Sequence, residues 1–345
     1  MRTICLNENN RGNTLYNKRI VCDIDDTISF CDNRDWENAT PNNPVIQKLI
    51  SLHDQGWEIF LHTARGSLSA KTPDDARKKY EGIITQWMAQ HKVPYDKLIF
   101  GKPLGTYYVD DKSITPEDFV ELKIEKLEGG LSGADVFRSG NIVHKTADNT
   151  LDAAKWYNIS KSSILKTPEI YKVVGETISM EYIIHNTDVD LDIVTNQLQS
   201  NSNYYHHDIP DFSTYVNRIR DKGLDEKYAN QLEEYSDFYN RNKSFCHGDA
   251  SIDNILCNDK TIYYIDPIYL PDVYSSWTLD IAKVLTSLKR YDKVRDYNII
   301  REKYRNIATE LYALEMSHWI RMYSYHPSKE YVMSQIERVY ESIRN

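Results

Sequence analysis

Residues 245–256 read FCHGDASIDNIL, and a short apolar run further on ends in YYIDP at residues 263–267. The first stretch forms an HxDxxxxN pattern with His247, Asp249 and Asn254, and the second ends a strand-like run with Asp266. Phosphoryl transfer to a hydroxyl needs a carboxylate near the acceptor and oxygen ligands for the Mg²⁺ that bridges the nucleotide phosphates. This spacing supplies both. The alternative is that the first stretch is a structural turn and the second an unrelated strand end, and each of these explains only one of the two stretches.

The stretch upstream of this loop carries features that suit a nucleotide site. Residues 128–137 read EGGLSGADVF, a glycine-rich turn that fits over phosphates, and Lys145 follows on the next expected strand. A later apolar strand ends at residues 181–183, where a hinge would grip adenine. A glycine-rich turn or a lysine alone is weak evidence, but here the order agrees with the downstream loop. The nucleotide-binding candidates are Gly130, Ser132, Gly133, Lys145, Glu181 and Ile183.

Taken together, residues 120–345 resemble the aminoglycoside phosphotransferase/choline kinase family, which has a protein-kinase-like fold. The resemblance implies that Asp249 is the catalytic base and that Lys145 contacts the α- and β-phosphates of ATP. The other implied roles are Mg²⁺ binding by Asn254 and Asp266, and support of the catalytic loop by His247 and Asp280.

The sequence departs from this family in the helix expected over residues 150–159. That helix carries no glutamate to pair with Lys145, and Asp152 is its only acid. Two alternatives stay open: Asp152 substitutes for the glutamate, or the ATP site is weakened.

A second group of acidic residues lies near the start of the chain, where residues 19–27 read RIVCDIDDT. Asp23 and Asp25 follow an apolar strand, and the carboxyl ends of strands form the ligand crevice of an open α/β sheet. Two aspartates at this spacing can share Mg²⁺, or one can act as a nucleophile and the other as a proton donor. The alternative is an acidic turn that caps the next helix.

Three later motifs favour the catalytic interpretation of this first site. FLHTARG at residues 60–66 supplies the hydroxyl of Thr63, FGKP at 100–103 supplies Lys102, and YYVDDK at 107–112 supplies paired carboxylates. In this order the motifs resemble the haloacid dehalogenase-like (HAD) phosphatases of capsule-biosynthesis clusters, over residues 17–120. The resemblance implies that Asp23 is the nucleophile, that Asp25 is the general acid and then the base, and that Thr63 and Lys102 bind the phosphoryl group. It assigns a Mg²⁺ to Asp23, Asp25, Asp110 and Asp111.

Strand and helix signals predict two domains. Residues 1–118 alternate β-rich and amphipathic runs, which indicates an α/β Rossmann-like HAD domain, and the segments after its first two motifs leave room for only a minimal cap. Its expected strands are 19–22, 57–62, 97–100 and 106–109, and its expected helices are 44–55 and 74–91. Residues 119–345 fit a two-lobed α+β kinase-like domain, with an N-lobe at about 119–184 and a C-lobe at about 185–345. The expected N-lobe strands are 124–128, 135–138, 141–146, 170–174 and 177–182.

The overall composition limits the class of protein. The chain has 345 residues, 41% of them hydrophobic and 27% charged, as in an ordinary globular protein. A net charge of −9 argues against broad electrostatic attraction to nucleic acid. No apolar run approaches the ~18 residues that span a bilayer, and the start lacks the apolar core of a signal peptide. We therefore expect a cytoplasmic protein without membrane insertion, and the sequence leaves homo-oligomer formation open.

We expect a bifunctional phosphate-transfer enzyme with Mg²⁺ in both sites. A phosphatase that forms an aspartyl-phosphate would be joined to an ATP-dependent kinase of a sugar, polyol or amino alcohol, and the resemblance suggests capsule or surface-polysaccharide precursor metabolism. Its partners would be ATP and a phosphorylated small molecule. One alternative is a phosphatase regulated by a nucleotide-binding, catalytically degenerate kinase-like domain. The other is nucleic-acid end processing, against which the acidic balance and the lack of a GxxxxGK(S/T) loop argue.

Overall fold

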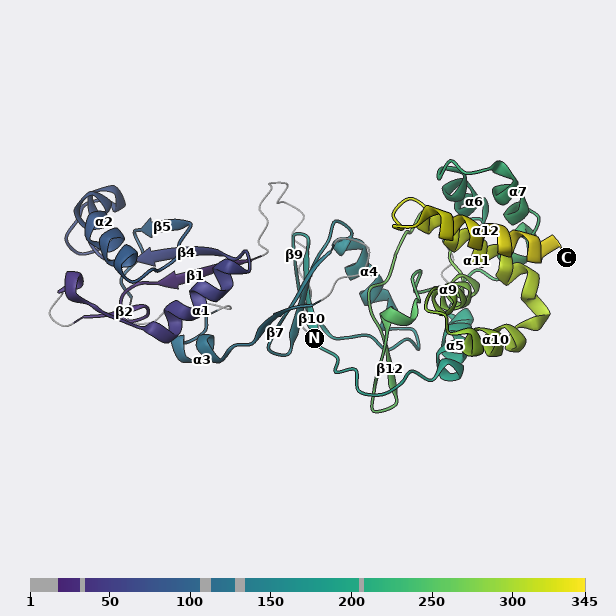
Figure 1. Ribbon diagram of the computed structural model, residues 1–345, viewed down its shortest axis with the longest axis horizontal. Coiled ribbons are helices and arrows are strands. Elements are labelled where there is room, and N and C mark those ends of the chain that lie inside the picture. The colour runs from purple at the N-terminus through teal and green to yellow at the C-terminus, as the bar shows by residue number, and fades with distance from the viewer. Residues whose placement is uncertain (1–17, 32–34, 106–112, 128–133, 205–207, 345) are drawn as a thin grey trace. The chain divides into compact units, whose positions relative to one another are not determined.

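The described chain forms two compact units that divide between Glu125 and Lys126 (Figure 1). The computed structural model describes residues 18–31, 35–105, 113–127, 134–204 and 208–344. The sequence predicted a boundary after residue 118, and this position falls inside α3 (Pro116–Glu121). This helix packs against α1 (Asn43–Asp54) of the first unit, so the chain leaves that unit later than predicted.

A three-stranded parallel sheet organises the first unit. β4 (Glu58–Thr63) lies between β1 (Arg19–Asp23) and β5 (Lys97–Phe100). α1 and α2 (Pro73–Gln90) connect these strands and bury their apolar sides. α2 begins with a proline in its first turn and with the side chain of Thr72 accepting a backbone N–H, both common signals of a helix start. Because the strands are parallel, the residues that follow them meet at one edge of the sheet.

The other elements of this unit are short. They are β2 (Ser29–Phe30), which pairs with β3 (Thr40–Pro41), and the 3-10 helix η1 (Trp36–Asn38). The described strands and helices of the parallel sheet lie within one residue of their predicted bounds at each end. The predicted strand at 106–109 lies outside the described residues.

The next sheet has five strands in the order β6-β7-β8-β10-β9, and the division between the two units falls within its first strand. Its strands are β6 (Ile124–Lys126), β7 (Asp135–Ser139), β8 (Ile142–Thr146), β9 (Ile170–Val174) and β10 (Thr177–Glu181). The four strands from β7 onward pair antiparallel, and α4 (Thr150–Ser160) joins β8 to β9. The five strands expected in this region are all present, and β10 lies between β8 and β9 instead of following β9 across the sheet.

The rest of the second unit is mostly helical. Its elements are α5 (Leu191–Ser200), η2 (Asn201–Asn203), α6 (Ser213–Arg220), α7 (Glu226–Glu233), α8 (Ser236–Arg241), η3 (Ile252–Asn254), β11 (Ile255–Asn258), β12 (Thr261–Tyr264), α9 (Trp277–Arg290), α10 (Val294–Lys303), η4 (Arg305–Ile307), α11 (Ala308–Met322) and α12 (Lys329–Arg344). β11 and β12 form an antiparallel hairpin. In the part of the chain that the structure describes, no helix combines the length and apolar character needed to cross a membrane.

Helix α9 is the centre of the helical core. Every residue from Trp277 to Leu288 is buried, and α9 packs against both α10 and α11. Burial all around the helix is unusual for a segment that contains Asp280 and Lys283, because isolated buried charges are costly. These two side chains therefore need partners, and both have them in the loop that carries Asp249.

Candidate functional sites

Three predicted side chains of the first unit meet at the carboxyl edge of its sheet. Asp23 ends β1, Thr63 ends β4, and Lys102 follows β5 by two residues. Lys102 Nζ forms an ion pair with Asp23 Oδ2, and Asp23 Oδ1 accepts a 2.9 Å hydrogen bond from the N–H of Ile24. A carboxylate, an ammonium group and a hydroxyl thus share one edge.

Asp25 is held by Arg65, a residue to which sequence reasoning gave no role. Arg65 Nε and Nη2 donate to Asp25 Oδ1 at 2.9 and 2.7 Å. Thr63 Oγ1 donates to Asp25 Oδ2 at 3.2 Å and accepts the N–H of Arg65 at 3.0 Å. The guanidinium is buried, with its Cζ 4.9 Å from the ring centre of Trp36. Such a two-point pair fixes the direction of the Asp25 carboxylate.

The neighbours of the Asp23–Lys102 pair are held uncharged. Burial raises the pKa of the Cys22 thiol to about 12, and the charge of Asp23 adds to this effect. Burial lowers the pKa of His62 below its ordinary value, against the attraction of Asp23. The ionic chemistry of this edge therefore belongs to the two aspartates, Lys102 and Arg65.

The structure describes only two of the four predicted Mg²⁺ ligands of this site. Asp110 and Asp111 lie outside the described residues, and among the described residues no three His, Cys, Asp or Glu side chains gather as a metal site. Asp23 and Asp25 offer the oxygen donors that Mg²⁺ prefers, so the donor chemistry fits the ion.

The second predicted site centres on Asp249. Lys283 Nζ lies 2.7 Å from Asp249 Oδ1. Asn254 Nδ2 donates to the backbone oxygen of Asp249 at 2.9 Å and to its Oδ2 at 3.0 Å. Burial acts to raise the pKa of Asp249, but the charge and hydrogen bond of Lys283 outweigh it, so the pKa lies below its ordinary value. The carboxylate is therefore ionised at neutral pH and able to accept a proton.

Asp280 supports the loop that carries Asp249. Its Oδ2 accepts the N–H of His247 at 2.7 Å, and its Oδ1 accepts the N–H of Gly248 at 2.8 Å. Gly248 has a φ of +78°, and a Cβ there would lie 2.2 Å from the carbonyl oxygen of Ile268, so only glycine fits. Burial raises the pKa of Asp280 to about 7, against the effect of the two N–H groups. The charge that holds this loop therefore titrates near neutral pH.

His247 is fully buried beside the loop. Its Nδ1 accepts the N–H of Asp249 at 3.3 Å, and its ring meets that of Trp156 edge-on. Burial lowers the pKa of His247 to about 4, against the attraction of Asp249 and Asp266, so the imidazole is neutral. Its Nε2 has no hydrogen-bond partner among the described residues.

Lys145 and Asp266 form an ion pair between β8 and the turn after β12. The N–H of Asp266, a residue with a φ of +56°, donates to the hydroxyl of Tyr157 at 3.1 Å. One residue earlier on α4, Trp156 Nε1 donates to the backbone oxygen of Cys246 at 2.7 Å. Neighbouring residues of α4 thus contact both functional loops.

The acid of α4 does not take the place of the missing glutamate. Asp152 Oδ1 accepts from Lys155 Nζ at 3.0 Å on the exposed side of the helix, whereas Lys145 pairs with Asp266. The alternative that Asp152 substitutes for the glutamate is therefore wrong in this structure. The contact between α4 and the turn that carries Asp266 comes from the hydroxyl of Tyr157.

The predicted adenine hinge lies at the end of β10. Glu181 ends this strand, and its backbone N–H donates to the oxygen of Glu169 at 2.8 Å. Ile183 is buried two residues later. The glycine-rich turn lies outside the described residues, so the roles of Gly130, Ser132 and Gly133 stay predictions.

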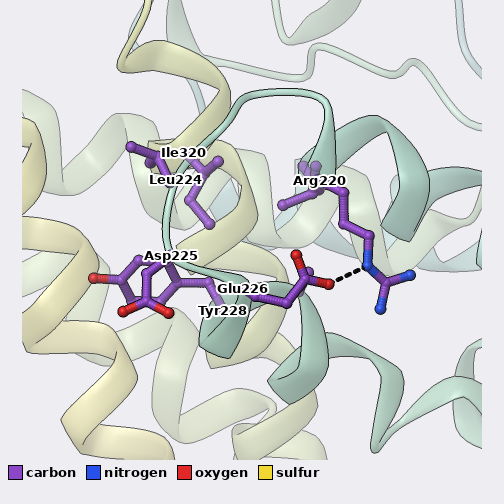
Figure 2. A pocket seen from close by; sticks show the side chains of 8 residues that line it. Arg220, Leu224, Asp225, Glu226, Tyr228 and Ile320 are labelled. Carbon is purple, nitrogen blue, oxygen red and sulfur yellow. Dashed lines mark hydrogen bonds and ion pairs between the residues drawn. The ribbon is translucent and has the colours of Figure 1, made fainter.

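Two pockets differ in their relation to these sites. One borders the Lys145–Asp266 pair and is lined by Lys145, Asn149, Thr150, Ala153, Tyr157, Ile178, Met180, Asp266 and Pro267. Figure 2 shows the other, which is lined by Ile219, Arg220, Leu224, Asp225, Glu226, Tyr228, Ala229 and Ile320. None of the predicted site residues lines it, and its Arg220 is paired with Glu226 at 2.5 Å. We therefore assign chemistry to the first pocket only.

Sequence reasoning missed three residues that these sites use. Lys283 lies three residues after Asp280, a spacing that places both side chains on one side of a helix. Arg65 lies two residues after Thr63 in a motif already singled out, so both had a local signal. Tyr157 had none, because only the fold brings α4 to Asp266.

Comparisons with solved structures find similarity over different shares of the chain. A target protein from Vibrio cholerae is 31% identical over 31% of this chain and 89% of its own, with a TM-score of 0.26. A choline/ethanolamine kinase family protein from Mesorhizobium loti is 14% identical over 65% of this chain and 88% of its own, with a TM-score of 0.45. An ethanolamine kinase from Plasmodium vivax is 10% identical over 66% and 83%, with a TM-score of 0.47. No family model and no curated protein matches the chain.

The two kinase structures match about 65% of the chain at no more than 14% identity, so a kinase activity of this chain stays a prediction. The HAD-like half stays a prediction.

Proposed function

We propose that residues 119–345 transfer a phosphoryl group from ATP to a hydroxyl of a small molecule. The observation that carries this proposal is the ionised Asp249, held between Asn254 and Lys283 in a loop that Asp280 supports. A purely structural aspartate does not need this set of partners, because one cation would neutralise it.

The chemical step follows from these contacts. Asp249 accepts the proton of the acceptor hydroxyl while the oxygen of that hydroxyl forms a bond to the γ-phosphorus of ATP. The bond from that phosphorus to the β–γ bridging oxygen breaks, and ADP leaves with the electron pair. Lys283 stabilises the charge of Asp249 and of the phosphoryl group in transfer.

We propose that the nucleotide binds between the loop that carries Asp249 and strand β8, which carries Lys145. Asn254 uses its amide nitrogen on Asp249, which leaves its amide oxygen as a donor for Mg²⁺ together with Asp266. Mg²⁺ would neutralise the β- and γ-phosphates. Lys145 is paired with Asp266 in this structure, so the same lysine is well placed for the α- and β-phosphates. Residues 181–183 would contact adenine.

ADP formation with a mixture of sugars, polyols and amino alcohols tests the kinase proposal. Asp249→Asn should lower the rate by about 10³-fold or more, since the base is lost. Asp253→Asn is the matched control, because Asp253 is exposed in the same loop and pairs with Arg290. Equal activity of wild type and Asp249→Asn would contradict the proposal, and so would an absence of ADP formation with every acceptor.

We infer a second activity for residues 1–118, hydrolysis of a phosphate monoester through an aspartyl-phosphate. It is supported by Asp23 at the end of β1, which is paired with Lys102 and lies two residues before the Arg65-bound Asp25. The Asp23 carboxylate would attack phosphorus and expel an alkoxide that Asp25 protonates, and water would then release phosphate. The ion would be Mg²⁺, and the surface-polysaccharide setting rests on the resemblance of residues 17–120.

Release of inorganic phosphate from a panel of phosphate monoesters tests this second activity. Asp23→Asn should lower the rate of phosphate release by roughly 10³-fold or more, because the nucleophile is removed. Asp26→Asn is the control, because Asp26 is an exposed neighbour with a φ of +57° that asparagine tolerates. Phosphate release that survives Asp23→Asn would overturn the assignment.

A further inference from the structure

Among the ion pairs of the described residues, Lys145 and Asp266 take part only in the one that joins them. Their side chains are 15% and 33% exposed, so water screens this pair less than a pair on the open surface. The lysine lies on β8 and the aspartate in the turn after β12, so the pair joins two parts of the second unit. Each charge is also one that the proposed nucleotide site would use for a ligand, the ammonium group for phosphate and the carboxylate for Mg²⁺.

The face of α4 that lines the pocket beside this pair carries no acid. Thr150, Ala153 and Tyr157 are three and four residues apart, and all three line the pocket that also contains Lys145 and Asp266. The hydroxyl of Thr150 lies 2.7 and 2.6 Å from two backbone oxygens, so its proton is already used. The hydroxyl of Tyr157 accepts the N–H of Asp266. Ala153, between them, has no polar group in its side chain.

The two members of the pair differ in how freely they can move. The turn that carries Asp266 is tied to α4, because the N–H of Asp266 donates to the hydroxyl of Tyr157 at 3.1 Å. Lysine carries its ammonium group on a flexible four-carbon chain. A ligand that parts the pair would therefore move the side chain of Lys145 and leave the turn in place.

Either ligand alone meets an obstacle in this arrangement. A metal ion at Asp266 would face the ammonium group of Lys145, and a phosphate at Lys145 would face the carboxylate of Asp266. Each would also leave one member of a partly buried pair without its partner, which is costly. When both ligands bind, each charge exchanges its partner for a ligand of opposite charge. The binding of one ligand therefore lowers the free-energy cost of binding the other.

We propose that the Lys145–Asp266 pair holds the nucleotide site closed until metal ion and nucleotide bind together, and that alanine at position 153 makes this pairing possible. The inference rests on the proposed kinase function and adds a coupling between its two ligands. α4 carries no glutamate, and a carboxylate in place of the Ala153 methyl group would give Lys145 a second acidic partner in the pocket. With alanine there, Asp266 is the acid that Lys145 reaches. ATP without a metal ion therefore binds weakly.

Calorimetry with an unreactive ATP analogue, in which nitrogen replaces the β–γ bridging oxygen, measures this coupling without turnover. The affinity of the full chain for the analogue is measured in EDTA and in Mg²⁺. We expect the wild type to bind about tenfold or more tightly in Mg²⁺. Asp266→Asn removes the charge that holds Lys145 and keeps the shape of the side chain. Its affinity in EDTA should rise by about tenfold and the gain from Mg²⁺ should be lost, whereas an aspartate that only binds metal would leave the affinity in EDTA unchanged.

Substitutions on α4 then locate the effect. Asp152→Asn is the matched control, because Asp152 is an acid of the same helix that pairs with Lys155, and it should leave both affinities unchanged. Ala153→Glu should draw Lys145 away from Asp266 and tighten binding of the analogue in Mg²⁺ by about fivefold. Ala153→Gln has the same size without the charge and should not. Circular dichroism checks that each variant is folded.

Failure of this inference is distinguishable from failure of the kinase proposal. If Asp266→Asn binds the analogue in EDTA no better than the wild type does, the pair does not hold the site closed, and the inference is overturned while the kinase proposal stands. Equal wild-type affinities in EDTA and in Mg²⁺ would overturn it as well. If Ala153→Glu behaves like Ala153→Gln, the part assigned to Ala153 is wrong. If no protein binds the analogue under either condition, the nucleotide site and the kinase proposal fail together with the inference.

Discussion

The two sites use the same pair of charges in two different settings. At the sheet edge, the candidate nucleophile Asp23 pairs with Lys102, and Asp25 pairs with Arg65. In the second unit, the candidate base Asp249 pairs with Lys283, and Asp266 pairs with Lys145. Each site therefore holds two carboxylates, each matched by one cation.

The difference between the sites lies in how these charges are held. The first site takes its four charged residues from the ends of strands that are neighbours in one sheet. The second takes them from a loop, a strand, a turn and a buried helix that lie far apart in the sequence. The first site is therefore expected to tolerate changes outside its edge, whereas the second depends on α4 and α9.

The largest effect that tests this comparison is expected for Lys283→Met. Loss of the ammonium group should lower kcat for ADP formation by about 10²-fold or more, because it faces both Asp249 and the phosphoryl group. Burial then raises the pKa of Asp249 without opposition from Lys283, so the acid limb of the kcat/KM profile should move to higher pH. Lys289→Met, on the same helix, is the control, and an unchanged acid limb would contradict the assigned role.

The second-largest effect is on the free energy of unfolding, to which Asp280 and His247 contribute with opposite pH dependence. The pKa of folded Asp280 is raised to about 7 by burial, so its contribution to stability falls as pH rises from about 4 to about 7. The pKa of folded His247 is lowered to about 4 by burial, so its contribution rises over about pH 4 to 6.5. Each amounts to on the order of 3 kcal/mol, and the two oppose each other in the wild type.

Hydrogen exchange of the α9 amides, corrected for intrinsic rates, measures this balance. Asp280→Asn should be stabilised as pH rises from 4.5 to 6.5, since the opposing contribution of Asp280 is gone. His247→Gln should be destabilised over the same range. Parallel pH profiles for wild type and both variants would show that neither pKa is shifted as described.

A smaller effect is expected at the first site for Arg65→Lys. Lysine keeps the charge beside Asp25 but cannot donate two parallel hydrogen bonds, so phosphate release should fall by about tenfold. Arg77→Lys on α2 is the control. Among the ion pairs of the described residues, Arg77 takes part only in the one with Glu81, on the surface side of its helix. An unaffected rate would mean that the clamp on Asp25 is dispensable.

The smallest effect is expected for Tyr157→Phe. Removing the hydroxyl leaves the N–H of Asp266 without its partner, a change worth about 1 kcal/mol, or roughly fivefold in KM for ATP. Tyr171→Phe, at an exposed position on β9, should change nothing. If both variants bind ATP like the wild type, α4 does not position the turn that carries Asp266.

The sequence predicted the parallel sheet and the hairpin sheet well, because both show local patterns. Alternating apolar runs and turn residues mark strands such as Lys97–Phe100, whose predicted and observed bounds agree. The convergence of Asp23, Thr63 and Lys102 was equally predictable, since residues after parallel strands meet at one edge.

The partners of the second site were less predictable because they depend on tertiary packing. Lys145 was expected to lack an acidic partner unless Asp152 supplied one, and it pairs instead with Asp266, 121 residues further along the chain. Neither this pair nor the contact of Tyr157 with the same aspartate has a periodicity or spacing that sequence could show.

The most direct test of two independent phosphate-transfer sites compares wild type, Asp23→Asn and Asp249→Asn. Each is incubated with Mg-ATP and the acceptor library, and mass spectrometry follows phosphorylated products over time. We predict that Asp23→Asn accumulates or retains a phosphorylated compound that Asp249→Asn cannot form, while Asp249→Asn still releases phosphate from monoesters. Loss of both activities in either variant, or the same phosphorylated product from all three proteins, would contradict the account.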